Sequence, residues 1–160
     1  MTRSIRPSCG CSIGRRAILG AAAALLTGAA AAAAPTRERP AEIVQPSVPG
    51  PKAFMERAFE MRRLAIERGD QPYGAVIVRN GRLVGEGPSA VVTDGDPTAH
   101  AEMQAIRDAA RRLGTNDLSG GEMYGSSRAC PMCAAGAYWA NLARLVYGSA
   151  LVDSGAPKLC

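Results

Sequence analysis

The stretches Pro97-Thr98-Ala99-His100-Ala101-Glu102 and Cys130-Pro131-Met132-Cys133 decide the fold of this chain, because each opens a segment with the features of a helix. A short run between them predicts a strand. We expect both helices to aim their first turns at one point. The sequence therefore predicts that His100, the only histidine of the chain, lies beside Cys130 and Cys133.

A histidine and two cysteines can form a zinc site. Cysteines at positions i and i+3 of a helix start point the same way, and the helix dipole lowers the pKa of their thiols toward the metal-binding thiolate. With His100 they supply three ligands and leave a fourth position for water, as in catalytic zinc sites. Zinc lowers the pKa of that water to about 7, and a carboxylate that is not on the metal can take its proton. Glu102 is the candidate for this role.

Each of these residues also has a purely structural interpretation. His100 alone is compatible with a helix cap or a solvated side chain, and Glu102 alone with a first-turn acid. Cys130 and Cys133 alone are compatible with a disulfide or a redox pair. The joint occurrence of His-x-Glu on one helix and Cys-x-x-Cys on the next favours a metal site.

Helices and strands alternate around the two stretches. The expected elements are a helix over 52–68, a strand over 75–78, a second strand from 83 that ends at Val91 and Val92, a helix over 99–113 capped by Thr98, a strand over 123–126, a helix over 131–142 and a strand over 144–147. Asn80-Gly81 predicts a tight hairpin between the first two strands. This order predicts an α/β fold with helices on both faces of a mixed sheet.

Length and charge limit the function classes. The 160 residues suffice for one domain with a hydrophobic core. The formal net charge is +5, but residues 1–34 hold four of the 19 basic residues and none of the 14 acidic ones. The rest of the chain is nearly neutral, which argues against a protein that wraps a nucleic acid. We expect a small, uncharged ligand.

Residues 1–34 have the pattern of an export signal. Paired arginines precede an alanine-rich apolar run, similar to the twin-arginine signals that carry folded proteins, and we expect a periplasmic or secreted protein. An uncleaved membrane anchor is the alternative, but the alanine content makes the run weakly hydrophobic. No stable membrane span is expected after cleavage. Residues 35–51 contain five prolines and predict an extended, mobile linker, followed by one domain over 52–160.

The two stretches resemble the zinc-dependent cytidine deaminase-like superfamily, in which H-x-E is followed by P-C-x-x-C. Four segments carry the resemblance: Pro72-Tyr73-Gly74-Ala75-Val76-Ile77-Val78, Asp96-Pro97-Thr98-Ala99-His100-Ala101-Glu102, Cys130-Pro131-Met132-Cys133 and Tyr138-Trp139-Ala140. Within the superfamily they look most like bacterial guanine deaminases and related nucleoside deaminases, and somewhat less like tRNA adenosine deaminases.

The resemblance implies a reaction and the residues that perform it. It implies that a purine base or nucleoside loses its exocyclic amine by hydrolysis, with release of ammonia. A guanine-type substrate is favoured. In this reaction zinc is held by His100, Cys130 and Cys133, and Glu102 moves the proton. The implied substrate-binding positions are Gly74, Ala75 and Ser89. The implied fold is a three-layer α/β/α sandwich with a mixed sheet, and the implied assembly is a homodimer.

Several positions depart from the superfamily pattern. Ser89 stands where many relatives have a base-binding Asn, and Arg128 and Ala129 replace the usual Glu-Pro. Arg128 can select a carboxylate or phosphate on the substrate or lie in solvent, and we expect solvent. The resemblance extends over about residues 72–148, and relatives carry a further strand and helices, so we expect a C-terminally short fold. Two alternatives follow, a tRNA adenosine deaminase and a non-catalytic zinc-binding domain.

Overall fold

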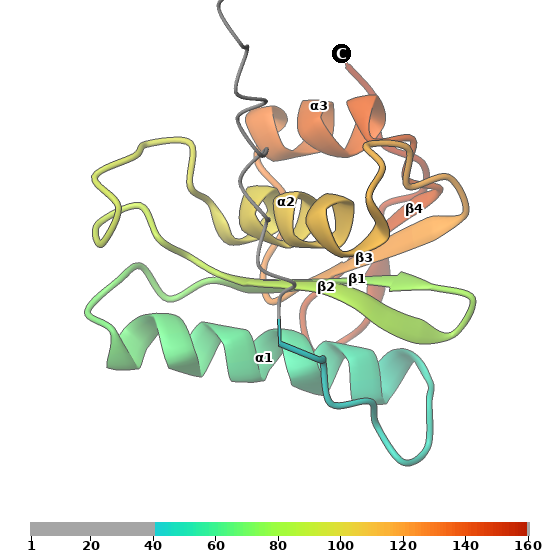
Figure 1. Cartoon of the computed structure of the whole chain (residues 1–160), viewed down its shortest axis with the longest axis horizontal. Helices are drawn as coiled ribbons and strands as arrows, with labels where there is room; N and C mark the ends of the chain where they lie inside the picture. The colour runs from blue at the N-terminus through green and yellow to red at the C-terminus, as the bar shows by residue number, and fades with distance from the viewer. Residues whose placement is uncertain (1–40, 160) are drawn as a thin grey trace, which may run out of the picture. The chain divides into compact units, whose positions relative to one another are not determined.

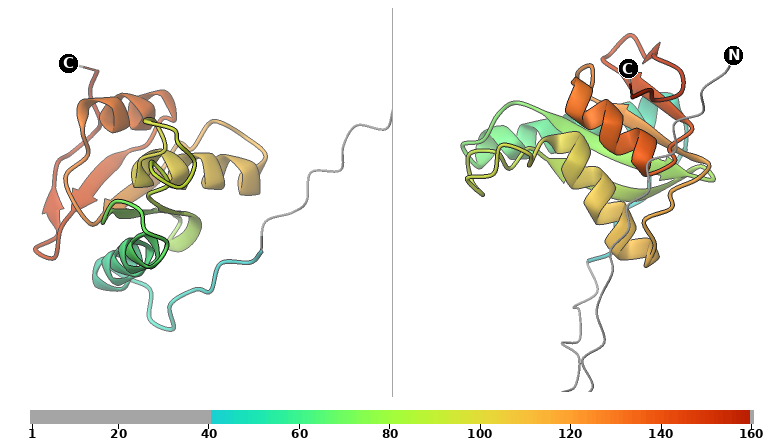
Figure 2. Two further views of the ribbon diagram at one scale, coloured as in Figure 1. Left: turned by 90° about the vertical axis from the view of Figure 1, so that its left-hand side faces the viewer. Right: turned by 90° about the horizontal axis from the view of Figure 1, so that it is seen from above.

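The computed structural model describes residues 41–159, and these form a five-stranded sheet in the order β2-β1-β3-β4-β5 (Figure 1). The elements are α1 (Pro51–Glu67), β1 (Gly74–Arg79), β2 (Arg82–Pro88), α2 (Ala101–Leu113), β3 (Gly121–Gly125), α3 (Pro131–Trp139), β4 (Arg144–Tyr147) and β5 (Val152–Asp153). β3 and β4 are parallel, and the other neighbouring pairs are antiparallel. α1 covers one face, and α2 and α3 cover the other (Figure 2). The predicted α/β/α sandwich with a mixed sheet is confirmed.

The hairpin between β1 and β2 forms where the sequence predicts it. Asn80 and Gly81 both have positive φ, 52° and 71°, the conformation that a two-residue turn of type I′ requires. β1 lies between β2 and β3 in the sheet, and its residues from Gly74 to Val78 are buried. Its alternate side chains therefore contribute to two separate cores, one under each helical layer.

The core under α1 is built from large side chains. Phe54, Met55 and Met61 of α1 pack against Val76 and Val78 of β1, and the Phe54 ring lies 5.5 Å from the ring of Tyr124 on β3. Burial of such side chains stabilises the fold by roughly 1.5–3 kcal/mol each. This layer supports the sheet from the side opposite the histidine and the cysteines.

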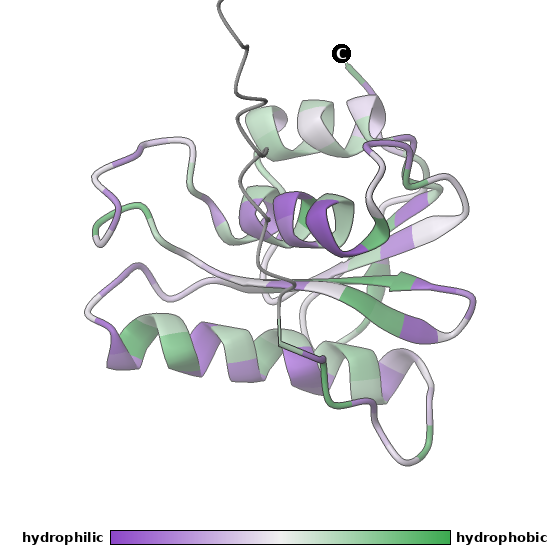
Figure 3. Ribbon diagram, in the orientation of Figure 1, coloured by the Kyte–Doolittle hydropathy of each residue, from purple (hydrophilic) through white to green (hydrophobic). Residues whose placement is uncertain are grey.

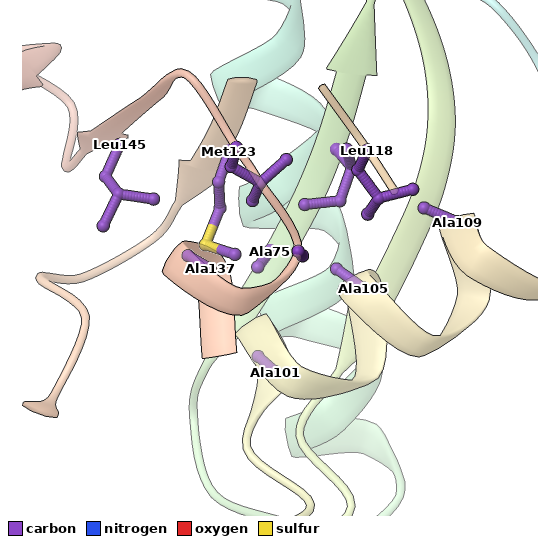
Figure 4. Packing of buried hydrophobic residues seen from close by; sticks show 11 residues of the cluster. Ala75, Ala101, Ala105, Ala109, Leu118, Met123, Ala137 and Leu145 are labelled. Atoms are coloured by element: carbon purple, nitrogen blue, oxygen red, sulfur yellow. The ribbon is translucent and has the colours of Figure 1, made fainter. Parts of the chain in front are cut away.

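α2 contributes only small buried apolar side chains to the core beneath it, which brings this helix close to the sheet. Ala101, Ala105 and Ala109 form the buried stripe of α2 (Figure 4). They face Gly85 and Gly87 of β2, where an added Cβ would lie 2.4–2.5 Å from the backbone of α2. The close approach leaves the helix little freedom to shift, so the first turn of α2 is held in place relative to the sheet.

Several predicted boundaries were wrong, including those of β3, which runs over Gly121–Gly125 instead of 123–126. β2 ends at Pro88, and Val91 and Val92 belong to a turn rather than to the strand. The N-cap of α2 is the extended residue His100, not Thr98, which instead hydrogen-bonds Asp96 through its backbone N–H and its hydroxyl. α3 ends at Trp139 instead of Leu142, since Asn141 takes a positive φ of 58° that ends the helix.

Part of the predicted linker lies within the described residues and packs on the domain. Ile43 is 5% exposed in the core under α1, and the Gln45 side-chain amide bonds both the N–H and the C=O of Leu83 on the edge of β2. This segment therefore covers part of a sheet edge, although its prolines predict a mobile chain. The predicted signal over 1–34 and the start of the linker lie outside the described residues. Within residues 41–159, no helix has the length and hydrophobicity needed to cross a bilayer.

Candidate metal centre and active site

His100, Cys130 and Cys133 converge at the N-terminal ends of α2 and α3. His100 Nδ1 lies 3.7 Å from Cys130 Sγ and 3.6 Å from Cys133 Sγ, and the two sulfurs are 3.6 Å apart. The three atoms form a nearly equilateral triangle. Both cysteines are free, and their sulfurs are well beyond the roughly 2.05 Å of a disulfide.

This triangle fits a tetrahedral zinc ion. With Zn–S distances of about 2.3 Å and a Zn–N distance of about 2.0–2.1 Å, tetrahedral angles require about 3.8 Å between the sulfurs and about 3.6 Å between sulfur and nitrogen. The observed separations of His100, Cys130 and Cys133 agree with these values to within about 0.2 Å. These residues are also the one His/Cys/Asp/Glu group within residues 41–159 whose ligand atoms lie close enough to share a metal. Three ligands leave a fourth position open.

Glu102 lies beside the triangle without being part of it. Its Oε2 is 3.5 Å from Cys133 Sγ, and the residue is 6% exposed. Burial, the nearby Glu102 carboxylate and Cys130 raise the pKa of the Cys133 thiol above its ordinary value. Without a bound metal, these effects therefore outweigh the predicted lowering of the thiol pKa by the helix dipole. Two thiolates and a carboxylate this close need a cation between them, and Zn²⁺ supplies that charge.

The loop before α2 is held by a residue that the sequence analysis did not identify. Asp70 Oδ2 accepts hydrogen bonds from the backbone N–H groups of Val92 and Thr93 at 2.9 and 2.8 Å and from the Thr93 hydroxyl at 3.1 Å. Burial acts to raise the pKa of Asp70, but these hydrogen bonds and that from the Gln71 N–H outweigh it, so the pKa lies well below its usual range. An acid just after a helix normally predicts only a solvated loop, and no sequence signal distinguishes Asp70 from such a residue.

The loop before α3 is attached to the start of β1. The Ser126 backbone N–H donates to the Gly74 carbonyl at 2.8 Å, and the Gly74 N–H donates to the Ser126 hydroxyl at 3.1 Å. After this loop, Pro131 occupies the first position of α3, where a helix does not need a backbone N–H donor. Cys130 and Cys133 are thereby placed on the first turn of the helix.

The three predicted substrate-binding positions occupy different surroundings. Gly74 packs against α1, where an added Cβ would lie 2.3 Å from the Ala58 carbonyl oxygen. Ala75 is fully buried in the core under α2. Ser89 is 2% exposed, close to Asp70, and its hydroxyl has no well-aligned hydrogen-bond partner among the described residues. Of the three, only Ser89 has a polar side chain, and its hydroxyl lies beside the Asp70 carboxylate.

A cavity of about 320 Å³ reaches Glu102 from the side of β3 and β4. Its walls come from the loop before α3, from β4 and from the segment after β5. Arg128 lines this cavity while remaining exposed, so it contacts both the cavity and solvent. The segment after β5 had no predicted role.

The comparisons with known proteins agree with this geometry. Residues 50–149 match the family model described as the cytidine and deoxycytidylate deaminase zinc-binding region. The chain is 38% identical over 104 residues to a guanine deaminase from Bacillus subtilis (strain 168), covering 64% of this chain and 67% of the relative. It is 35% identical over 100 residues to a tRNA-specific adenosine deaminase from Aquifex aeolicus (strain VF5), covering 62% and 66%.

A solved structure shows the same architecture. The X-ray structure of guanine deaminase from Bacillus subtilis superposes with a TM-score of 0.58 and 40% identity, over 61% of this chain and 62% of that chain. This chain thus spans about two thirds of the length of the relatives it matches. The matched family region contains the whole triangle of ligand atoms and Glu102.

Proposed function

The chain belongs to the cytidine and deoxycytidylate deaminase family, and from this membership we propose that it is a zinc-dependent hydrolase that releases ammonia from a purine base or nucleoside. The observation that supports the proposal most directly is the triangle of His100, Cys130 and Cys133 with Glu102 beside it. A closed structural zinc site would have a fourth protein ligand. Here a carboxylate stands next to an open position, as hydrolysis requires.

The side chains of the site have distinct proposed roles. Bound to His100, Cys130 and Cys133, zinc would supply a water whose pKa is lowered to about 7. Glu102 is buried and within 3.5 Å of one ligand, so its carboxylate is placed to hold a proton and return it to the departing amine. Ser89 offers a buried hydroxyl for a polar atom of the substrate.

A guanine-type substrate is favoured over an adenosine in tRNA. The identities to the guanine deaminase and to the tRNA-specific adenosine deaminase are similar, 38% and 35%, and do not separate the two. Outside residues 1–34 the chain has 15 basic and 14 acidic side chains, which supplies little attraction for a phosphate backbone. We therefore place tRNA second.

An ammonia-release assay tests the proposal. Full-length protein of measured zinc content is incubated with guanine, guanosine, adenosine, cytosine, cytidine and a tRNA. We expect ammonia from guanine or guanosine. Release from none of these substrates by zinc-loaded protein would favour the non-catalytic zinc-binding alternative, and inosine in the tRNA alone would favour tRNA adenosine deamination.

We further propose that the chain forms a homodimer through α3. This helix carries no charged residue, and Figure 3 shows it without the strongly hydrophilic positions of α1 and α2. Trp139 is 72% exposed and packs edge-on against the half-exposed Tyr138. An apolar face of this kind is typical of an interface, and two copies can share it through a twofold axis. Sedimentation should show a dimer that Trp139→Glu converts to a monomer, whereas a monomeric wild type would contradict the proposal.

Export by the paired-arginine segment stays a prediction from sequence. Replacement of Arg15 and Arg16 by lysines should retain the protein in the cytoplasm of a bacterial host, as measured by cell fractionation. Equal amounts of wild type and variant in the periplasm would contradict this prediction.

A further inference from the structure

The cavity beside Glu102 has opposite charges in its walls. Among the described residues that line it, Glu102 is the only acidic one, and Arg128 and Lys158 are the two basic ones. Arg128 comes from the loop before α3, and Lys158 from the segment after β5. Two parts of the chain that are 30 residues apart in sequence therefore bring positive charge to the same cavity.

Neither cation is neutralised by a neighbour. Within residues 41–159, Arg128 and Lys158 make no ion pair, whereas Arg144 nearby on β4 is paired with Glu122 at 2.7 Å and with Asp153 at 3.5 Å. Glu122 and Asp153 are thus already paired with Arg144. An anion that enters the cavity would meet two cations without competing for an existing ion pair.

The rest of the cavity is suited to an aromatic ring and to a polar tail. Met123, Leu145 and Val146 supply apolar walls, and Tyr147 is the one aromatic residue among those that line it. The hydroxyl residues Ser127 and Ser154 lie in the same walls as the two cations. A volume of about 320 Å³ is at the lower end of the range of small-molecule sites, and it is larger than a single ion needs.

We propose that this cavity binds the phosphate group of a nucleoside monophosphate, with Arg128 and Lys158 as the anion-binding residues. The proposal rests on the proposed deaminase function, since it places the purine ring toward Glu102 and the phosphate toward the two cations. The planar guanidinium of Arg128 can bond two phosphate oxygens, and Lys158 adds a point charge. The proposed substrate class is thereby extended from purine bases and nucleosides to purine nucleoside monophosphates.

Kinetics with a matched series of substrates tests the proposal. Zinc-loaded full-length protein is assayed for ammonia release from guanine, guanosine and guanosine monophosphate. We expect the lowest KM for the monophosphate. Arg128→Gln and Lys158→Gln should each raise that KM by about ten- to a hundredfold, because each removes a hydrogen bond to a charged group. Guanosine has no phosphate, so the same variants should raise its KM much less than the KM for the monophosphate, and the ratio of the two KM values measures the effect.

A control variant separates this effect from a general loss of charge. Lys52 is an exposed lysine on α1, on the opposite face of the sheet, and Lys52→Gln should leave the KM for guanosine monophosphate unchanged. If Arg128→Gln and Lys158→Gln behave like Lys52→Gln while guanosine is turned over, the phosphate site is refuted and the deaminase function stands.

A binding experiment decides the proposal when no substrate is turned over. Inorganic phosphate is titrated into wild type and variants, and binding is followed by isothermal titration calorimetry. Binding to wild type that is lost in Arg128→Gln and Lys158→Gln supports the anion site even though the deaminase function has failed. Absence of binding to wild type, or equal binding to all variants, overturns the proposal.

Discussion

The loops that lead into α2 and α3 both deliver metal ligands, yet they are held in different ways. The loop over 89–100 is tied to the end of α1 by the Asp70 carboxylate, which accepts three hydrogen bonds from Val92 and Thr93. The loop over 126–130 is tied to β1 only at Ser126, and its next residues line the cavity. One loop is fixed at Val92 and Thr93, within its length, and the other is fixed only where it begins.

This difference separates the chemistry of the site from its choice of substrate. The ligand triangle depends on two helix starts that the close packing of α2 and the position of Pro131 hold in place. The cavity depends on Arg128, which makes no ion pair within residues 41–159, and on the segment after β5, which backbone hydrogen bonds of Ser154 and Gly155 tie to Leu145 of β4. Substitutions in the second loop can therefore change what is bound without moving the metal ligands.

Both loops must deliver ligands to the same metal ion, and Cys133→Ser removes one of these ligands at the start of α3. A hydroxyl is a poor ligand for zinc, so we expect loss of bound zinc and of all ammonia release. Zinc content by elemental analysis and turnover should fall together. Met132→Leu, one position away on the same turn, should keep both. A Cys133→Ser protein with full zinc content would show that the triangle is not the metal site.

Glu102→Gln removes the proton-transferring group while keeping the size of the side chain. We expect full zinc content and a fall in kcat of about 10²–10⁴-fold, since a positioned acid–base group contributes about this factor. Circular dichroism and zinc analysis establish that the fold and the metal are retained. Equal turnover by variant and wild type would refute the role of Glu102 and favour a non-catalytic site.

The ligands and most elements could be predicted because local signals specify them. His-x-Glu and Cys-x-x-Cys have fixed spacings, Asn80-Gly81 specifies a hairpin, and the apolar spacing of α1 specifies a helix. The short β5 was missed, because Val152 and Asp153 pair with β4 through tertiary contact and have no alternating pattern.

Asp70 and the cavity could not be predicted for a similar reason. Asp70 gains its role from N–H groups 22 and 23 residues away, which no local pattern reveals. Arg128 is exposed, as the sequence predicts, but only the fold shows that it also shares a cavity with Lys158. Contacts between distant segments determine these features.

Asp70→Asn tests how strongly the first loop is held. Because folding lowers the pKa of Asp70, its carboxylate stabilises the protein above its unfolded pKa of about 3.9, and this contribution is lost as the pH falls through the lower folded value. We expect Asp70→Asn to reduce the free energy of unfolding by about 1–3 kcal/mol at pH 7, and the deficit to shrink below about pH 4. Urea unfolding of both chelator-treated proteins measures this. Asp94→Asn, an exposed acid of the same loop, is the control, and a deficit that does not depend on pH would contradict the assignment.

Ser126→Ala tests the second loop and should have the smallest effect of the four. It removes one neutral hydrogen bond, that from the Gly74 N–H, and leaves the backbone bond from the Ser126 N–H to the Gly74 carbonyl in place. We expect a loss of about 0.5–1.5 kcal/mol in the free energy of unfolding, with zinc content unchanged. Because this loop lines the cavity, the substitution should also raise the KM for the deaminated substrate, with little change in kcat. A loss larger than that of Asp70→Asn would reverse the comparison, since the second loop would then depend more on its single anchor than the first loop does on its network.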